Sequence, residues 1–285
     1  MNFKTKLKET LKDILSEEEL KFLPRGFQTL GNIIIFKLNQ KLFEKEKLIA
    51  KAYLELLPRI RSVYVNRGKI AGTYREPEKI ELIGGEDNPI VYHKEHEVIY
   101  NFDITKIMFS KGNINERKYL STLVQKGEIV VDMFAGIGYF SLPIAKHSLV
   151  SKIYAIEVNP ESYKFLVKNI KLNQMEDIII PIKGDCKEEV LKLSKAGIKA
   201  DRVIMGVFPA PKDYIKDAFS LVKYKGTIFH YEGVVEKNNY IALFNEFKEI
   251  CSNNGYFCEL ISYRFVKSYG PNLFHLVIDI LTKKI

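Results

Sequence analysis

From Glu128 onward the chain alternates short apolar strands with helices, and this alternation restricts the possible folds more than any other feature. Strands are predicted by EIVVDMF, KIYAIEV, DIIIPIKGD, ADRVIMGVF and GTIFHYEGV, and helices by YFSLPIAKH and PESYKFLVKNIKLN. Such an alternation indicates a parallel sheet that is covered by helices. The last two apolar segments, YFCELISYRFV and LFHLVIDIL, have only a short link between them. We therefore expect them to form an antiparallel pair at the edge of the sheet.

The first third of the chain has a different pattern. Its apolar spacing predicts an amphipathic helix over 3–22, a strand over 32–39 and a helix over 42–57. Four further segments, bounded by Gly and Pro turns, are typical of antiparallel strands and span 62–68, 79–85, 90–96 and 97–104. The pattern changes near Asn113. We therefore expect an N-terminal α+β domain over residues 1–105 and an α/β domain over residues 106–285.

The composition is that of an ordinary folded protein. With 285 residues, of which 46% are hydrophobic, the chain can bury a sizeable core without disulfide bonds. Its three cysteines form neither a closely spaced pair nor a cluster with the five histidines, which favours a reducing, cytoplasmic compartment. No apolar run is long enough to span a bilayer, and we expect no membrane partner. We also expect a monomer.

The formal net charge is +9, and a field of this sign favours a polyanionic partner, of which nucleic acid is the usual one. A general enrichment in lysine would give the same charge, so composition alone does not establish an RNA substrate. The excess is spread along the chain, and any basic face must therefore be assembled by folding. In the N-terminal domain the candidates for RNA contact are Arg59, Arg61, Arg67 and Arg75.

The segment VVDMFAGIGYFS, residues 130–141, is the strongest candidate for a ligand site. A buried strand runs into Asp132, and Gly136 and Gly138 follow before the next helix begins. Glycines allow positive φ and a close approach of the backbone to a ligand, and free N–H groups at the start of a helix attract anionic groups. A dinucleotide-dependent dehydrogenase would favour a third glycine where this chain has Ser141. A tight turn without any ligand is the other alternative.

Acidic residues at the ends of the next two strands complete this candidate site. Glu157 ends the second strand, where a carboxylate can accept hydrogen bonds from both ribose hydroxyls of a nucleoside. Asp185 ends the third strand and can accept from an adenine amino group, while the N–H of Cys186 can donate to a ring nitrogen. The combination favours S-adenosylmethionine as the nucleoside. We expect the Cys186 side chain to line the pocket and not to act as a nucleophile.

A metal site is not expected. His93 and His96 lie on one predicted strand, and no third ligand accompanies them. His230 and His275 lie in predicted strands, where we expect them to be packed and hydrogen-bonded.

The segment DITKIMFSKGNINERKYL, residues 103–120, joined to VVDMFAGIGYFSLPIAKH, resembles the Trm5/TYW2 family of enzymes that act on position 37 of tRNA. The resemblance runs from about residue 20 to the end and includes GTYREPEKIELIGG and RFVKSYGPNLFHLVIDI. It implies a class I methyltransferase-like (Rossmann-like) fold, in which a doubly wound sheet ends in a hairpin. It also implies S-adenosylmethionine as the co-substrate.

Two glycines distinguish the branches of this family. The methyltransferase branch typically reads F-S-P-R before the Glu-Arg pair and M-N-L-P or N-P-P after the fourth strand, where this chain has Gly112 and Gly206. The form F-S-x-G-N-I-x-E resembles the TYW2 branch, which transfers the 3-amino-3-carboxypropyl group of S-adenosylmethionine to C7 of 4-demethylwyosine in tRNA-Phe. The alternatives are a tRNA guanine-37 N1-methyltransferase and a tRNA-binding protein that no longer catalyses a reaction.

Both glycines fit a change in the transferred group. Methylation of guanine N1 needs side chains that hold the base and remove its proton, whereas the tricyclic base offers an electron-rich ring carbon that attacks Cγ of the methionine chain. We expect Gly206 to leave room for the wider base and for a reversed methionine chain.

The resemblance also implies roles for residues at the start of the catalytic domain. Ser110 and Arg117 would contact S-adenosylmethionine, together with Glu157, Asp185 and Cys186. Arg117 suits a carboxylate, because a guanidinium makes a two-pronged charge-assisted contact. Glu116 matches the proposed general base of the methyltransferase branch, and here it would take the C7 proton or orient Arg117.

The substrate side of the site is expected to contain Lys111, Asn113, Gly206 and Phe208, with Lys111 near a phosphate of the anticodon stem-loop. The target base must leave its stack. The aromatic candidates for stacking on it are Tyr139, Phe208 and Tyr231.

Overall fold

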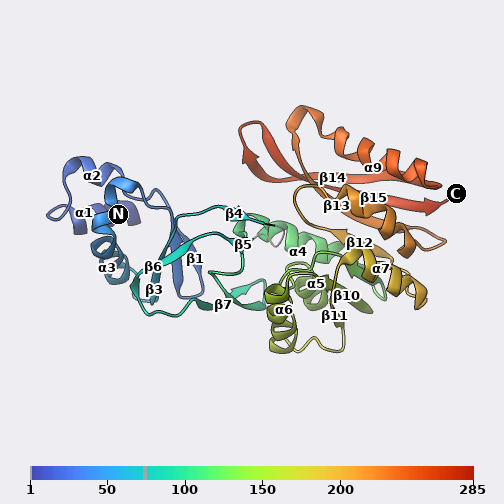
Figure 1. The fold of residues 1–285 in the computed structure, drawn as a ribbon, viewed down its shortest axis with the longest axis horizontal. Helices are drawn as coiled ribbons and strands as arrows, with labels where there is room; N and C mark the ends of the chain where they lie inside the picture. Colours follow the sequence, from blue (N-terminus) through green and yellow to red (C-terminus); the bar gives the residue numbers. More distant parts are fainter. Residues whose placement is uncertain (1, 73–75) are drawn as a thin grey trace. The chain divides into compact units, whose positions relative to one another are not determined.

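The computed structural model describes residues 2–72 and 76–285, and the chain divides into two compact units (Figure 1). The first unit consists of Met1–Lys94 and Ile99–Phe109, and the second of Glu95–Val98 and Ser110–Ile285. Each unit has a buried hydrophobic core of its own.

The first unit is built on a four-stranded sheet with the order β1-β2-β3-β6. β2 and β3 run parallel, whereas β1 pairs antiparallel with β2 and β6 pairs antiparallel with β3. β4 pairs with β5 and β7 with β8 in two small separate sheets. The strands are β1 Gln28–Leu30, β2 Ile33–Phe36, β3 Ser62–Asn66, β4 Ile70–Ala71, β5 Glu76–Pro77, β6 Ile80–Gly85, β7 Ile90–Glu95 and β8 Val98–Asp103.

The helices of the first unit differ in one respect from the expectation. The single helix expected over 3–22 is wrong, because two helices, α1 (Phe3–Leu11) and α2 (Glu17–Lys21), occupy this stretch. α1 ends at Leu11, and Ser16 begins α2 in a capping box, in which a side-chain oxygen satisfies a free helix N–H. α3 (Glu46–Leu56) follows the 3-10 turn η1 (Gln40–Lys45), and confirms the helix expected there.

The second unit contains a seven-stranded sheet with the order β11-β10-β9-β12-β13-β15-β14. The neighbouring pairs from β11 to β13 are parallel, whereas β15 runs antiparallel to both β13 and β14. The predicted parallel sheet with an antiparallel hairpin at its edge is therefore confirmed. The strands are β9 Ile129–Asp132, β10 Lys152–Glu157, β11 Ile179–Lys183, β12 Arg202–Met205, β13 Thr227–Glu236, β14 Tyr256–Gly270 and β15 Leu273–Lys284.

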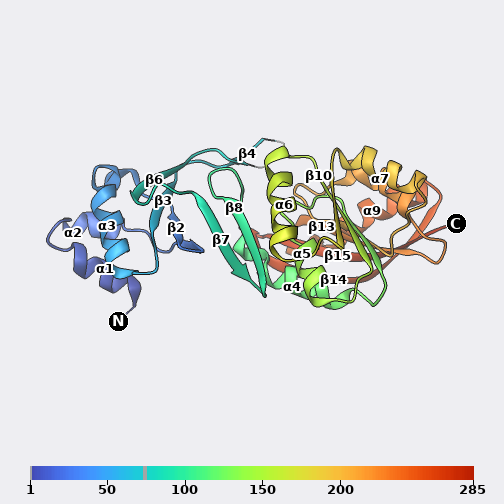
Figure 2. The same ribbon diagram turned by 90° about the horizontal axis from the view of Figure 1, so that it is seen from below.

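Helices cover both faces of this sheet. Side chains of α7, α8 and α9 share one core with Val131, Val203 and Phe229 of the strands. α4, α5 and α6 lie on the other side (Figure 2). The bounds are α4 Ile114–Leu123, α5 Ser141–His147, α6 Pro160–Leu172, α7 Cys186–Lys195, α8 Ile215–Ala218 and α9 Ile241–Asn253, with 3-10 turns η2 Lys111–Asn113, η3 Lys212–Tyr214, η4 Phe219–Leu221 and η5 Lys237–Asn239.

The order of the strands fixes where a ligand can bind. The chain passes from β9 to β10 and β11 on one side, and then returns to place β12 and β13 on the other side of β9. In open α/β sheets ligands bind outside the carboxyl ends of the strands at such a switch point. Among the helices that the structure describes, none is both long enough and apolar enough to cross a membrane.

Candidate functional site

The glycine loop leaves the carboxyl end of β9 at the switch point. Gly136 and Gly138 have φ values of 58° and 98°, which residues with a side chain rarely adopt. An added Cβ would lie 2.5 Å from the Tyr139 ring at Gly136 and 2.7 Å from the Leu142 side chain at Gly138. The loop therefore folds tightly over the start of α5, and both glycines are needed for its shape.

Asp132 lies beneath this loop and is 1% exposed. One carboxylate oxygen accepts a hydrogen bond of 2.7 Å from the hydroxyl of Ser141, which begins α5. Burial raises the pKa of Asp132 to about 7, although the Ser141 hydroxyl and the Phe134 N–H act in the opposite direction. Asp132 thus supports the loop from below, and its role toward a ligand remains a prediction.

Glu157 connects the loops that follow β9 and β10. Its two oxygens accept hydrogen bonds of 2.7 Å from the backbone N–H groups of Gly136 and Asn159. Asn159 in turn caps α6 with its side chain. Burial raises the pKa of Glu157, whereas these backbone donors lower it. Because each carboxylate oxygen has a second lone pair, this fixed carboxylate can still accept from ribose hydroxyls.

Asp185 and Cys186 begin α7 at the end of β11. The Asp185 side chain caps the helix by accepting from the Lys187 N–H at 2.8 Å. Cys186 is buried, and burial raises the pKa of its thiol to about 12. A thiol with such a pKa is a poor nucleophile, and that Cys186 lines the cofactor pocket remains a prediction.

Two aromatic residues that the sequence analysis missed lie nearby. The rings of Phe134 and Tyr214 pack edge to face with their centroids 5.2 Å apart, and Lys187 lies 4.7 Å from the Tyr214 ring. Phe134 lies two residues after the end of β9, and its only sequence signal was the apolar character of the glycine-loop segment.

Arg117 lies in α4 and is 2% exposed. Its guanidinium makes a two-pronged contact with Glu95, with distances of 2.7 and 2.6 Å, and also donates to the carbonyl of Ser110 at 3.0 Å. The expected partner of this fork was a ligand carboxylate, but in the structure it is Glu95, which the sequence analysis did not single out. Arg117 thereby fixes the segment that contains Ser110.

Glu116, on the same helix, belongs to a chain of buried charges. Both of its carboxylate oxygens contact the guanidinium of Arg264 on β14. Arg264 also donates to Asp279 of β15 at 2.6 Å, and Asp279 contacts His230 of β13. His230 is buried and hydrogen-bonded, as predicted. The sequence analysis missed Arg264 and Asp279, because a single charged residue within a strand does not show in the sequence which residue it will pair with.

The segment from Ser110 to Asn113 contacts β14 at Lys267. The Lys267 ammonium donates to the Ser110 hydroxyl at 2.9 Å, and its Cδ would lie 2.6 Å from a Cβ added to Gly112. Asn113 precedes α4, and its side-chain oxygen is buried without a hydrogen-bond partner in the described structure. Burial lowers the pKa of Lys111. An unpaired buried acceptor is costly, so Asn113 Oδ1 fits a ligand donor well.

The expectation that Gly206 leaves room for the base and the methionine chain remains a prediction. A Cβ at this position would lie 2.6 Å from the ring of Phe140 and 3.5 Å from Glu232. The space beside Gly206 is therefore filled by the side chain that ends the glycine loop. Phe208, two residues later, packs edge to face on His275 with centroids 4.6 Å apart, and His275 pairs with Glu232 at 3.0 Å.

Tyr231 does not fit the role of a stacking residue. It is fully buried, and its hydroxyl donates to Glu246 of α9 at 2.9 Å. Because its ring belongs to the core, it has no free face for a base. Tyr139 is half-buried beside Gly136.

No metal site is found among residues 2–72 and 76–285. His93 lies 3.4 Å from the Gly31 N–H, and His96 contacts the carbonyl of Ile114.

The basic residues expected to contact RNA in the first unit behave differently from one another. Arg67 is paired with Glu46 and Glu81 and lies 4.3 Å from the Phe43 ring, so its charge is already neutralised. Arg59 and Arg61 are exposed, and Arg75 lies outside the described residues.

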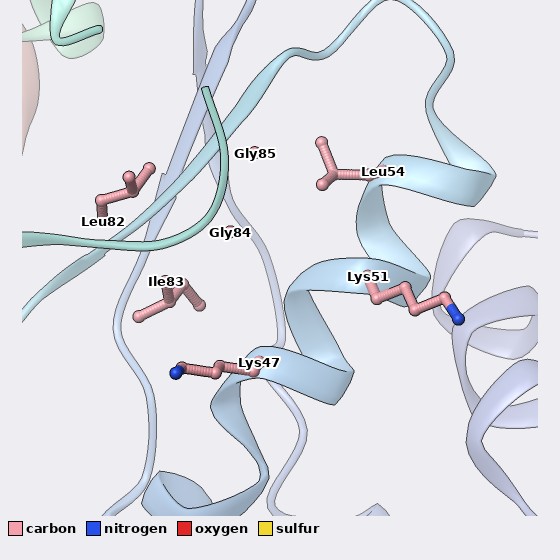
Figure 3. A pocket seen from close by; sticks show the side chains of 7 residues that line it. All are labelled: Lys47, Lys51, Leu54, Leu82, Ile83, Gly84 and Gly85. Atoms are coloured by element: carbon pink, nitrogen blue, oxygen red, sulfur yellow. The ribbon is translucent and has the colours of Figure 1, made fainter. Parts of the chain in front are cut away.

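An open pocket between α3 and β6 offers another basic group in the first unit. It is lined by Lys47, Lys51, Leu54, Leu82, Ile83, Gly84 and Gly85. The Lys47 side chain points toward Ile83, whereas the Lys51 ammonium points away (Figure 3). Gly84 allows the close approach of β6 to the helix, because a Cβ there would lie 2.6 Å from Ala50.

Comparison with known proteins places this geometry in context. The sequence profile of the TRM5/TYW2 methyltransferase domain matches residues 91–260, and that of the TYW2 N-terminal domain matches residues 7–88. A tRNA(Phe) (4-demethylwyosine(37)-C(7)) aminocarboxypropyltransferase from Methanocaldococcus jannaschii is 36% identical over 89% of this chain and 96% of that protein. The protein of the same name from Pyrococcus horikoshii is 36% identical over 97% of this chain and 96% of its own. The tRNA (guanine(37)-N(1))-methyltransferase Trm5b of Pyrococcus abyssi is 32% identical over 92% of this chain and 76% of its own.

Solved structures agree with these matches. P. horikoshii TYW2 in complex with MeSAdo superimposes with a TM-score of 0.83 at 33% identity, covering 99% of this chain and all of that one. M. jannaschii TYW2 in complex with AdoMet gives a TM-score of 0.70 at 31% identity, covering 91% of this chain and all of that one. The class I methyltransferase-like fold and the resemblance of the sequence motifs are thus confirmed. The chain belongs to the TRM5/TYW2 family.

Proposed function

We propose that this protein is a tRNA-Phe 4-demethylwyosine C7 aminocarboxypropyltransferase that uses S-adenosylmethionine. The observation that carries the proposal is that both halves of the chain match TYW2: the N-terminal profile is that of TYW2, and two aminocarboxypropyltransferases are 36% identical over almost their whole length. Trm5b relatives match at 32% and 31% identity and extend beyond the matched region.

In the proposed reaction, C7 of the base attacks Cγ of the methionine chain. The Cγ–S bond breaks, its electron pair stays on sulfur, and 5′-methylthioadenosine leaves while the base loses its C7 proton. Catalysis of such a displacement depends mainly on alignment of the reacting atoms. Glu157 would hold the ribose and Asp185 the adenine amino group, while Ser110 and Asn113 would face the methionine chain.

The contacts of Glu116 do not identify it as the group that accepts the C7 proton. Arg264 engages both of its oxygens, so a base at this position would first have to exchange this ion pair. A role of Glu116 as general base therefore remains a prediction, and so does its second expected role, the orientation of Arg117.

The RNA partner is proposed to be the anticodon stem-loop of tRNA-Phe, with further phosphate contacts from the first unit. Exposed Lys47, Arg59 and Arg61 supply positive charge there, and the net charge of +9 acts in the same direction. A monomeric state and a cytoplasmic location also remain predictions.

The test uses tRNA-Phe that contains 4-demethylwyosine, with S-adenosylmethionine labelled in the methyl carbon or in the carboxyl carbon. We expect only the carboxyl label to enter the tRNA, with release of methylthioadenosine. Entry of the methyl label, with release of S-adenosylhomocysteine, would show a methyltransferase instead. Binding of the tRNA without transfer of either label would identify a protein that has lost its activity.

A further inference from the structure

The second unit has an exposed cluster of aromatic rings on its edge strand. Tyr240, at the start of α9, stacks on Tyr263 of β14 with a centroid distance of 4.4 Å and an angle of 21°. Phe265 packs edge to face on Tyr263 at 6.2 Å and on Phe274 of β15 at 5.6 Å. We call Tyr240, Tyr263, Phe265 and Phe274 the aromatic platform.

The platform is open to solvent, although it is built from residues that usually fill cores. Tyr263 is 46% exposed and Phe265 is 36% exposed, and the next residue along α9, Ile241, is 40% exposed. A contiguous group of exposed apolar residues on a folded protein marks an interaction site more often than isolated ones do.

The strand register places the platform at the reactive end of the sheet. Glu236, the last residue of β13, pairs with Leu273, which begins β15 directly after the turn from β14. The turn of the β14–β15 hairpin therefore lies at the carboxyl end of β13, and α9 begins beside it (Figure 1). At the same end, Phe208 from the loop after β12 lies 6.0 Å from Tyr269 of this hairpin. The platform thus borders the region where the ligand site is expected.

The chemistry of the platform fits unpaired nucleotides. The Lys237 ammonium lies 5.8 Å from the Phe274 ring. Exposed aromatic faces with nearby lysines are what proteins use to stack bases of single-stranded RNA and to neutralise its phosphates. The Tyr240–Tyr263 stack is still partly exposed to solvent, so one more planar ring, such as a base, can add to it.

We propose that the aromatic platform stacks on an unpaired nucleotide of the anticodon loop next to the target base. This inference rests on the proposed function and adds a second RNA contact to it, outside the pocket for the reacting base. The stack on Tyr263 holds the loop open after the target base has left its own stack.

The principal test measures affinity for the anticodon stem-loop of tRNA-Phe after replacement of platform residues. For Tyr263→Ala combined with Phe265→Ala we expect about tenfold weaker binding or more, because one stacked base contributes on this order. Tyr263→Phe should retain wild-type affinity, since it keeps the ring. Phe257→Ala is the matched control, because Phe257 lies on the same strand, 53% exposed, near the opposite end.

A second measurement reports the stacking directly. The chain contains no tryptophan, so Tyr263→Trp introduces a single fluorescent reporter into the platform. Its emission should be quenched by the stem-loop, whereas that of Phe257→Trp should not change. This measurement remains informative even if the alanine variants fold poorly.

Three outcomes would overturn the inference: unchanged affinity of the double variant, an unquenched Trp reporter, or a loss of self-association in the double variant by sedimentation, which would identify a second copy as the occupant. Failure of the proposed function is distinguished by the wild-type transfer assay. If the wild type transfers the carboxyl label and the platform variants bind RNA normally, only the platform proposal fails.

Discussion

Glu157 shows that the fold holds one site carboxylate in place through backbone hydrogen bonds before any ligand binds. Its position after the second strand could be inferred from the sequence, whereas its backbone partners, Gly136 and Asn159, could not. These partners belong to two different loops, and only the parallel pairing of β9 with β10 brings the loops together.

For Glu157→Ala we expect about 100-fold weaker binding of S-adenosylmethionine, because charge-assisted hydrogen bonds to the ribose and to both loops are lost. Transfer activity should fall with it, while tRNA affinity stays unchanged. Calorimetry with the co-substrate and filter binding with tRNA measure the two quantities. Glu161→Ala is the control, because Glu161 lies in the same region but pairs with Lys164 on the surface. Equal co-substrate binding in both variants would contradict the assigned role.

The raised pKa of Asp132 predicts that the stability of the folded protein depends on pH. Its folded-state pKa is raised from 3.8 to about 7, so between these values the folded protein retains a proton that the unfolded chain has released. The contribution of Asp132 to stability is therefore greatest at low pH and is lost as the pH rises toward 7, with a slope of up to about 1.4 kcal/mol per pH unit. Asp132→Asn should remove this part of the slope. Urea unfolding of both proteins from pH 4 to 8 measures it, and parallel curves would refute the prediction.

At the scale of elements, Arg264 connects α4 with the edge hairpin. It contacts Glu116 of α4 and Asp279 of β15, which are 4% exposed each. The sequence predicts the hairpin, but Glu116 and Arg264 lie 148 residues apart in the chain. No local pattern can indicate such a pair.

Arg264→Ala should lower the free energy of unfolding by about 3–5 kcal/mol, because buried Glu116 loses its ion-pair partner and buried Asp279 loses one of its partners. Denaturant titration measures the loss. In contrast, Arg61→Ala should change it by less than about 1 kcal/mol, since Arg61 and Glu86 form an exposed pair at 3.9 Å. Similar effects of the two substitutions would contradict the buried-pair interpretation.

The elements themselves were predictable to different degrees. The strands from β9 to β13 and the hairpin were predicted because short apolar segments separated by helices leave few alternatives. The end of α1 at Leu11 and the cap of α2 at Ser16 were missed, because the apolar spacing continues through both. The packing of the Phe140 ring against Gly206 was also not predicted, because Phe140 lies in the loop after β9 and Gly206 follows β12.

At the scale of the whole molecule, the net charge of +9 does not say which basic side chains are available to RNA, because this depends on how the fold pairs them. Of the four arginines expected to contact RNA in the N-terminal domain, Arg67 is neutralised by Glu46 and Glu81. Lys47 instead points toward Ile83 in the pocket between α3 and β6.

For full-length tRNA we expect Lys47→Ala to weaken binding and to reduce the slope of log affinity against log salt by about 1, as the loss of one phosphate contact does. Lys51→Ala is the matched control on the same helix, because its ammonium points away from the pocket. Filter binding at several salt concentrations measures both. Equal slopes for the two variants would remove Lys47 from the proposed RNA contact.

The sequence by itself determined the order of strands and helices, the glycine loop with its acidic neighbours, and the resemblance to one family. These features are local, because each depends on residues that are close together in the chain. The tertiary structure decided which charges are free. It paired Arg117 with Glu95, Glu116 with Arg264 and Arg67 with Glu46 and Glu81. A buried charge must find its partner in space, and its availability for a ligand is therefore a property of the fold.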